Sequence, residues 1–172
     1  MRGGIIGLVF SLGLAFANSE NLILTALTYM ERPYQFGANE LYRMDCSAFV
    51  QRVFEVNGIK LPRSTAEQAQ VGVPVYLHEL RPGDLLFYST YRKGPSHVGI
   101  YIGKGKMVHA SESTGITVSR IEDPYWQKRF LFARRVMTGT FVASSESKRV
   151  KYKGAPSGRD DIADLIFILS GR

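Results

Sequence analysis

The chain has 172 residues, with 22 lysines and arginines against 15 aspartates and glutamates, a net charge of +7, and a single cysteine. One cysteine excludes an intramolecular disulfide, and the length suits one domain with its own core. A basic surface favours an anionic partner such as a cell-wall polymer or lipid headgroups. Nucleic acid is not expected as a partner, because the body of the chain has no basic run interleaved with aromatic residues.

The first 17 residues are typical of a secretory signal peptide. Arg2 supplies a short positive start, residues 4–16 form an uncharged and mostly apolar run, and Ala-Phe-Ala at 15–17 is the small-x-small pattern that precedes cleavage. The alternative is an uncleaved membrane anchor, but the run is short for a bilayer and polar residues follow at once. We therefore predict export, with no integral membrane span in the mature chain. In an exported protein an odd cysteine indicates a free reactive thiol or intermolecular pairing.

Helices are predicted in the first part of the body of the chain. Residues 20–31 carry apolar positions for a first helix, which Pro33 ends. A second helix is predicted over 45–56, with Asp45 as its N-cap. A third is predicted from Ser64 to about residue 71, because Ser-Thr-Ala-Glu at its start is a capping box.

Short strands follow the helices. These segments are rich in β-branched and aromatic residues, and glycine-containing turns separate several of them. They are 84–89, 97–102, 106–111, 116–121 and 129–136. Helices followed by an antiparallel meander predict an α+β fold, with N-terminal helices packed on a sheet of about five strands. A parallel doubly wound sheet is disfavoured.

The C-terminal segment differs in composition from the rest. Residues 138–158 are rich in Ser, Lys, Gly and Thr, which is typical of a tail or linker. Apolar residues then recur at helical spacing over 160–169, which predicts one short amphipathic helix packed back on the domain. A docking or membrane-contact helix is the alternative. The predicted organisation is a signal peptide at 1–17, a domain at 18–137 and a tail at 138–172.

Cys46 is the first candidate for chemistry. Residues 46, 49, 50, 53 and 54 form the apolar stripe of a core-facing helix, so Cys46 lies in its first turn. Unpaired N–H groups and the helix dipole favour negative charge there, and such a position can lower the pKa of a thiol. The alternative is a small buried hydrophobic residue, since free cysteines are often buried.

Two histidines are predicted to meet on the sheet. His97 and His109 are equally far from residue 103, the centre of the turn between their strands. In a hairpin they lie opposite one another or one diagonal step apart, on the same face, where one imidazole can orient the other. His78 has no such partner and is predicted to lie on the surface.

A cysteine nucleophile needs a base and a third group that orients the base, which Cys46, His97 and His109 together supply. A zinc site of the same three residues is an alternative, but no carboxylate stands at short ligand spacing beside them, and we expect no metal. Structural coincidence is the third possibility. Tyr34 precedes Cys46 by twelve residues. Its phenol either donates to a developing oxyanion or packs as a loop aromatic.

Six ordered blocks of sequence resemble the NlpC-type family of cell-wall cysteine peptidases, which has a compact papain-like fold. They cover much of residues 21–136 and agree with the family in order and spacing. The blocks are PYQFG at 33–37, DCSAFV at 45–50, LPRSTAEQ at 61–68, LRPGDLLF at 80–87, HVGIYIG at 97–103 and MVHA at 107–110. We expect no wall-binding module beside the domain in this sequence.

The resemblance implies roles for particular residues. Cys46 would be the nucleophile, His97 the general base and then acid, His109 the residue that orients His97, and Tyr34 the support of the oxyanion. Asp45 and Ser47 would help to hold the peptide substrate. Arg63 is a weaker candidate for substrate contact, and an ordinary helix-flanking cation is the preferred interpretation of it.

The implied reaction is hydrolysis of an amide bond in murein stem peptides or crosslinks, through a thioester on the cysteine and without a cofactor. The implied partner is therefore the peptidoglycan stem peptide, and we expect a monomeric enzyme in the periplasm, or else secreted or associated with the cell wall. Alternatives on the same fold are a non-catalytic wall-binding domain, an exported toxin, or an enzyme that acts on lipid amide or acyl bonds.

Overall fold

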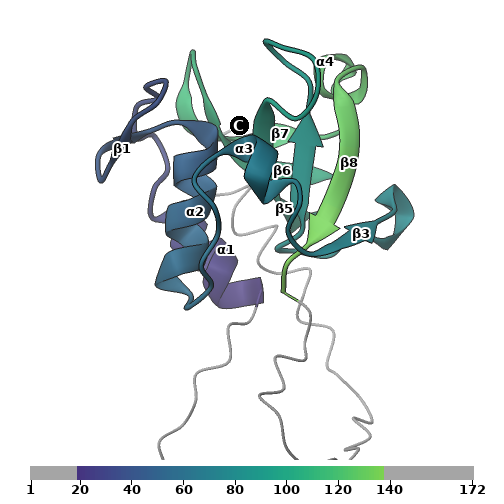
Figure 1. Cartoon of the computed structure of the whole chain (residues 1–172), viewed down its shortest axis with the longest axis horizontal. Coiled ribbons are helices and arrows are strands. Elements are labelled where there is room, and N and C mark those ends of the chain that lie inside the picture. Colours follow the sequence, from purple (N-terminus) through teal and green to yellow (C-terminus); the bar gives the residue numbers. More distant parts are fainter. Residues whose placement is uncertain (1–18, 138–172) are drawn as a thin grey trace, which may run out of the picture.

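The computed structural model describes residues 19–137. The predicted signal peptide at 1–17 and the predicted tail and helix at 138–172 lie outside the described residues. Within the described range, no helix is long and apolar enough to cross a membrane. Figure 1 shows two layers, with α1 (Ser19–Leu27) and α2 (Cys46–Val56) on one side of an antiparallel sheet.

The helix α2 begins where the sequence predicts it. The carboxylate of Asp45 accepts a hydrogen bond of 2.8 Å from the backbone N–H of Ala48, which confirms Asp45 as the N-cap. Such a cap stabilises a helix by about 1 kcal/mol. The helix ends at Val56 with Asn57 as its C-cap, and Gly58 follows with a φ of +79°. Its apolar stripe packs on the sheet, as the spacing predicts.

Two helices are shorter than predicted, each for a local reason. The helix α1 ends at Leu27 instead of residue 31, because Glu31 has a φ of 66° and its N–H bonds to the carbonyl of Ile116 on the sheet. The helix α3 (Thr65–Gln68) is one turn long. Its capping box is confirmed, but Gly72, with a φ of +81°, turns the chain into a strand soon afterwards.

The main sheet has six antiparallel strands in the order β3-β8-β4-β5-β6-β7. Its strands are β3 (Val73–Val75), β4 (Leu85–Tyr88), β5 (His97–Gly103), β6 (Lys106–Ser111), β7 (Gly115–Arg120) and β8 (Phe130–Arg135). The α+β prediction is confirmed, and the five predicted strands are all present. The edge strand β3 is additional. It has only three residues, one of them a proline, so it carries little strand signal.

The sheet also departs from a simple meander. Strands β4 to β7 follow one another, but β8 pairs with β4 on the far side of the sheet. The connection from β7 to β8 contains the short helix α4 (Pro124–Gln127), which the sequence analysis did not predict. A small hairpin of β1 (Asn39–Glu40) and β2 (Arg43–Met44) precedes α2, and a 3₁₀ turn, η1 (Leu77–Glu79), follows β3.

Both faces of the sheet are buried. On one face, α1 and α2 pack against alternate residues of the central strands, such as Val98 and Val108. On the other face, a smaller cluster forms around Tyr88 and Met107, with Trp126 of α4 packed against it. The alternation of side chains along β5 therefore sends neighbouring residues into two different cores.

A buried ion pair joins the residue just before β4 to the end of β8. Both carboxylate oxygens of Asp84 accept hydrogen bonds of 2.8 Å from the guanidinium of Arg135. A third bond of 2.7 Å comes from the backbone N–H of Arg81. The side chain of Asp84 is only 2% exposed, so these bonds are what satisfies the charge.

Candidate active site

The start of α2 lies against the start of β5, which brings Cys46 close to the backbone of the residues on either side of His97. The thiol of Cys46 is 3.6 Å from the hydroxyl of Thr65 and 3.9 Å from the carbonyl oxygen of Ser96. The backbone of Val98 also hydrogen-bonds the thiol. The sulfur therefore contacts the backbone on both sides of His97. Its side-chain hydrogen-bond partner among the described residues is Thr65, which the sequence analysis did not identify, rather than the imidazole of His97.

Burial controls the protonation of this thiol. Cys46 is 4% exposed, and burial raises the pKa of the thiol. Hydrogen bonds from Thr65 and from the backbone of Val98 oppose the shift, whereas the nearby charge of Asp45 adds to it. The resting cysteine is therefore a protonated thiol. A lowered pKa, expected from the helix start alone, is not found, because loss of solvent outweighs the favourable backbone groups.

His97 and His109 form the predicted pair. Nε2 of His97 is 3.1 Å from Nδ1 of His109, and the two rings meet edge to face at 81°. Gly99 is the register partner of His109, so His97 lies one diagonal step away on the same face. A Cβ on Gly99 would lie 2.9 Å from Sδ of Met107 and 3.2 Å from Cβ of His109, so the absence of a side chain there leaves room for both residues. The same-face prediction is confirmed.

Two neighbours of the pair were not predicted. Nε2 of His109 is 2.9 Å from Oγ of Ser119 on β7. The indole of Trp126 stacks on His97 with ring centres 5.2 Å apart and meets His109 edge to face at 4.8 Å. The Asp-Pro dipeptide before Trp126 is a helix-start signal, but nothing local to it indicates that this helix covers the histidines.

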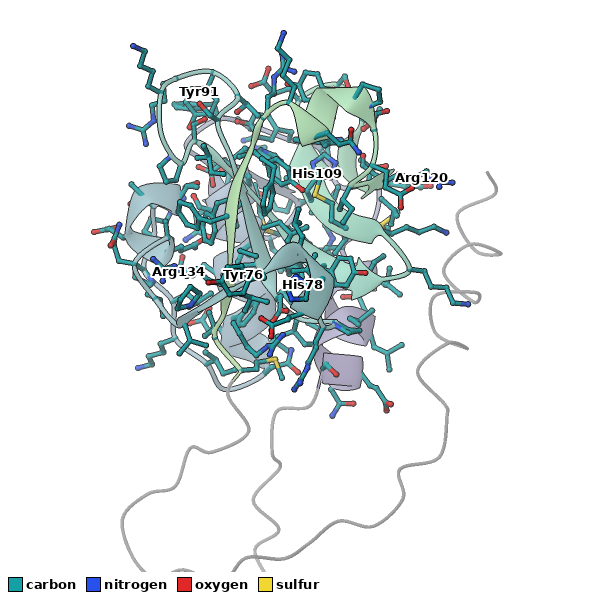
Figure 2. The ribbon with its side chains drawn as sticks, turned by 90° about the vertical axis from the view of Figure 1, so that its right-hand side faces the viewer. Tyr76, His78, Tyr91, His109, Arg120 and Arg134 are labelled. Carbon is teal, nitrogen blue, oxygen red and sulfur yellow. The ribbon has the colours of Figure 1, made fainter. Side chains whose placement is uncertain are left out.

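His78 takes no part in the pair, as predicted. It is exposed and stacks on Tyr76 with ring centres 5.8 Å apart. Figure 2 shows Tyr76 and His78 beside one another and well away from His109.

Burial keeps both paired imidazoles neutral near pH 7. It lowers the pKa of His97 to about 4. It also lowers the pKa of His109, and a charge on His97 would lower it further. A neutral imidazole can accept a proton, so His97 has the protonation state that a general base requires.

The same shift predicts that acid destabilises the fold through His97. An unfolded histidine binds a proton near pH 6.5 but the folded residue only near pH 4, so the unfolded state binds more protons between these values. The contribution of neutral His97 is complete above pH 6.5 and falls by about 3 kcal/mol as the pH drops to 4. Urea unfolding at a series of pH values measures this loss.

Two variants separate this contribution from other acid effects. His97→Gln is expected to unfold with a shallower dependence on pH, because it cannot take up the proton. His78→Gln is expected to retain the dependence of the original chain. Equal pH dependence in His97→Gln and in the original chain would contradict the assignment.

A cleft of about 490 Å³ opens at the histidine pair. Its lining includes Tyr34, Tyr91, His97, His109, Glu112 and Trp126. Tyr34 is held there by a parallel bridge to Met44, just before α2. Burial and the neighbouring Cys46 raise the pKa of its phenol, which therefore stays protonated and can donate a hydrogen bond. The structure thus brings Tyr34 to the cleft beside the histidines, and its role at an oxyanion stays a prediction.

Asp45, Ser47 and Arg63 form one network at the start of α2. The guanidinium of Arg63 donates to both oxygens of Asp45, at 3.0 and 2.8 Å, and to the hydroxyl of Ser47 at 3.0 Å. It also donates to two backbone carbonyls in the loop before β1. Arg63 is therefore more than a helix-flanking cation, because it fixes the cap of the helix that carries Cys46. Contact of these three residues with substrate stays a prediction.

No three potential ligand side chains among the described residues are placed to hold a metal ion. The zinc alternative for Cys46, His97 and His109 therefore gains no support from this part of the structure.

A cysteine at a helix start, packed against a strand whose histidine is hydrogen-bonded to a second histidine on the next strand, defines a class of α+β proteins with a cysteine–histidine site. The chain belongs to the NlpC/P60 family, whose model matches residues 31–135.

Three known proteins illustrate the likeness. Murein DD-endopeptidase MepS/murein LD-carboxypeptidase of Escherichia coli K12 is 47% identical over 106 residues, which are 61% of this chain and 56% of that protein. A probable endopeptidase NlpC homolog of Haemophilus influenzae is 45% identical over 105 residues, 60% and 55% of the two chains. The crystal structure of an NlpC/P60 family protein from Bacillus cereus matches with a TM-score of 0.66 and 29% identity, over 70% of this chain and 41% of that one. The chain spans about half the length of the curated relatives it matches.

Proposed function

We propose that this protein is a murein endopeptidase that hydrolyses an amide bond of a stem peptide or crosslink through a thioester on Cys46. The observation that carries the proposal is the hydrogen-bonded pair of neutral imidazoles, His97 and His109, next to the backbone that the Cys46 thiol contacts. The family membership and the murein peptidase name of the Escherichia coli relative support it.

The first half of the reaction forms the thioester. Nε2 of His97 is bound to His109, so Nδ1 is the nitrogen that takes the thiol proton. The thiolate of Cys46 attacks the carbonyl carbon and a C–S bond forms, while the oxyanion accepts hydrogen bonds from the phenol of Tyr34 and the backbone N–H of Cys46. The C–N bond then breaks, and the imidazolium of His97 protonates the leaving amine.

The second half restores the enzyme. His97 is neutral again after the amine leaves, so it can take a proton from a water molecule that attacks the thioester carbon. The C–S bond breaks, the acid is released, and the proton returns to the sulfur. Because the resting thiol lies against Thr65, the sulfur has to leave this contact before it comes within hydrogen-bond distance of Nδ1 of His97. Catalytic hydrogen bonds often tighten only in the complex with substrate.

We propose further that the protein acts as a monomer in the periplasm. The histidine pair and Tyr34 line one cleft within a single chain, so the proposed chemistry needs no residue from a second copy. The signal-peptide pattern at 1–17 supports export.

Digestion of purified murein with the full chain tests the function, with mass spectrometry of the released muropeptides as the readout. We expect new muropeptides whose masses identify the cut amide bond, and none from a Cys46→Ala digest. Identical profiles with and without a folded protein would contradict the peptidase and leave a wall-binding domain as the better interpretation.

A further inference from the structure

His109 is held from two sides across three neighbouring strands. Its Nδ1 is 3.1 Å from Nε2 of His97 on β5, and its Nε2 is 2.9 Å from Oγ of Ser119 on β7. Both distances lie in the normal range for hydrogen bonds. The three side chains therefore form a continuous hydrogen-bonded row that ends on a hydroxyl group.

The number of protons in this row restricts which of its atoms donate hydrogen bonds and which accept them. Each imidazole carries one N–H when neutral, and burial lowers the pKa of both rings, so that both are neutral near pH 7. In one arrangement His109 donates from Nε2 to Ser119 and accepts at Nδ1 from Nε2–H of His97. In the other, Ser119 donates to His109, His109 donates to His97, and the proton of His97 is on Nδ1.

Only the first arrangement suits a base at Nδ1 of His97. In the second arrangement Nδ1 already carries a proton and cannot take another from the thiol. When His97 becomes an imidazolium, both of its nitrogens are donors. Its Nε2–H then needs an acceptor at Nδ1 of His109, which the first arrangement already provides.

We infer that Ser119 is a positioning residue, whose hydroxyl accepts the Nε2–H of His109 and so supports the tautomer of His97 with a free Nδ1. Without this acceptor, the Nε2–H of the buried His109 would be left unsatisfied in that arrangement. The inference rests on the proposed function for the role of Nδ1, but the tautomers themselves exist whether or not murein is the substrate. Ser119 is not among the residues that line the cleft, so its effect passes through His109.

Nitrogen-15 NMR of the imidazole rings tests the tautomers in the full chain. The sequence has three histidines, and the exposed His78 serves as an internal reference. At pH 7 we expect His97 and His109 each to carry the proton on Nε2. In Ser119→Ala the signals of both rings should move toward those of a mixture of tautomers. In Ser119→Thr, which keeps a hydroxyl, the signals should stay at their positions in the original chain.

Kinetics with a soluble murein peptide give the second readout. We expect kcat of Ser119→Ala to fall by about 10–100-fold, by analogy with the partners that orient metal-bound imidazoles, with KM unchanged and with Ser119→Thr close to the original chain. A proton on Nδ1 of His97 in the original chain would overturn the inference, and so would identical ring signals in Ser119→Ala. If the predicted tautomers are found but murein is not cut, the proposed function fails and the tautomer assignment stands.

Discussion

Replacing Cys46 with alanine is expected to lower kcat/KM for a soluble murein peptide by at least about 10⁴-fold, because no other group can form the thioester. Oxyanion support and substrate binding alone leave only a small residual rate. The measurement is the initial rate of peptide cleavage, with the released amine quantified by chromatography. Because Cys46 is buried, circular dichroism and thermal unfolding must show that the variant folds.

Two further variants make the result specific. His97→Ala should also lose most of the activity, since the thiol then has no base. His78→Ala is the matched control, because it removes an exposed imidazole that is far from the pair and should leave the rate unchanged. A folded Cys46→Ala protein that keeps more than a tenth of the original rate would contradict the assignment of the nucleophile.

Replacing Asp84 with alanine is expected to lower the free energy of unfolding by about 3–5 kcal/mol, the usual cost of breaking a buried ion pair. The substitution leaves the guanidinium of Arg135, 19% exposed, without its carboxylate, and it frees the backbone N–H of Arg81. Small domains unfold with about 5–15 kcal/mol in total. Urea unfolding should therefore show a large loss of stability.

The exposed pair of Arg120 and Glu122 provides the control. Its atoms are also close, at 3.0 Å, but the side chains are 74% and 63% exposed. Glu122→Ala should change the free energy of unfolding by no more than about 1 kcal/mol, because water screens the pair. Equal effects of Asp84→Ala and Glu122→Ala would show that burial of the first pair does not control its strength.

Features that depend on residues close together in the sequence were predictable. The cap of α2 follows from Asp45 at its start, and the pairing of His97 with His109 follows from equal spacing about a tight turn. Each depends on residues close in sequence, so backbone geometry alone restricts the outcome.

Features that depend on long-range packing were not predictable. Ser119 reaches His109 only because β6 and β7 pair in a register that places Met107 opposite Ser119. The turn between the two strands determines this register, and the composition of the strands does not. Trp126 reaches the pair because β8 crosses to β4 and takes α4 over the sheet. The raised pKa of Cys46 likewise reflects burial by distant elements rather than the helix that it begins.

The central claim is that murein peptides are cleaved through a thioester on Cys46. Its most direct test is a single-turnover reaction, quenched in acid at successive times and examined by mass spectrometry of the peptide that contains Cys46. Because the chain has one cysteine, the adduct has one possible thiol site. We expect the mass of the Cys46 peptide to increase transiently by that of the acyl part of the substrate, and hydroxylamine to remove this increase. Cleavage of the same substrate with Cys46 free of adduct at every time point would contradict it.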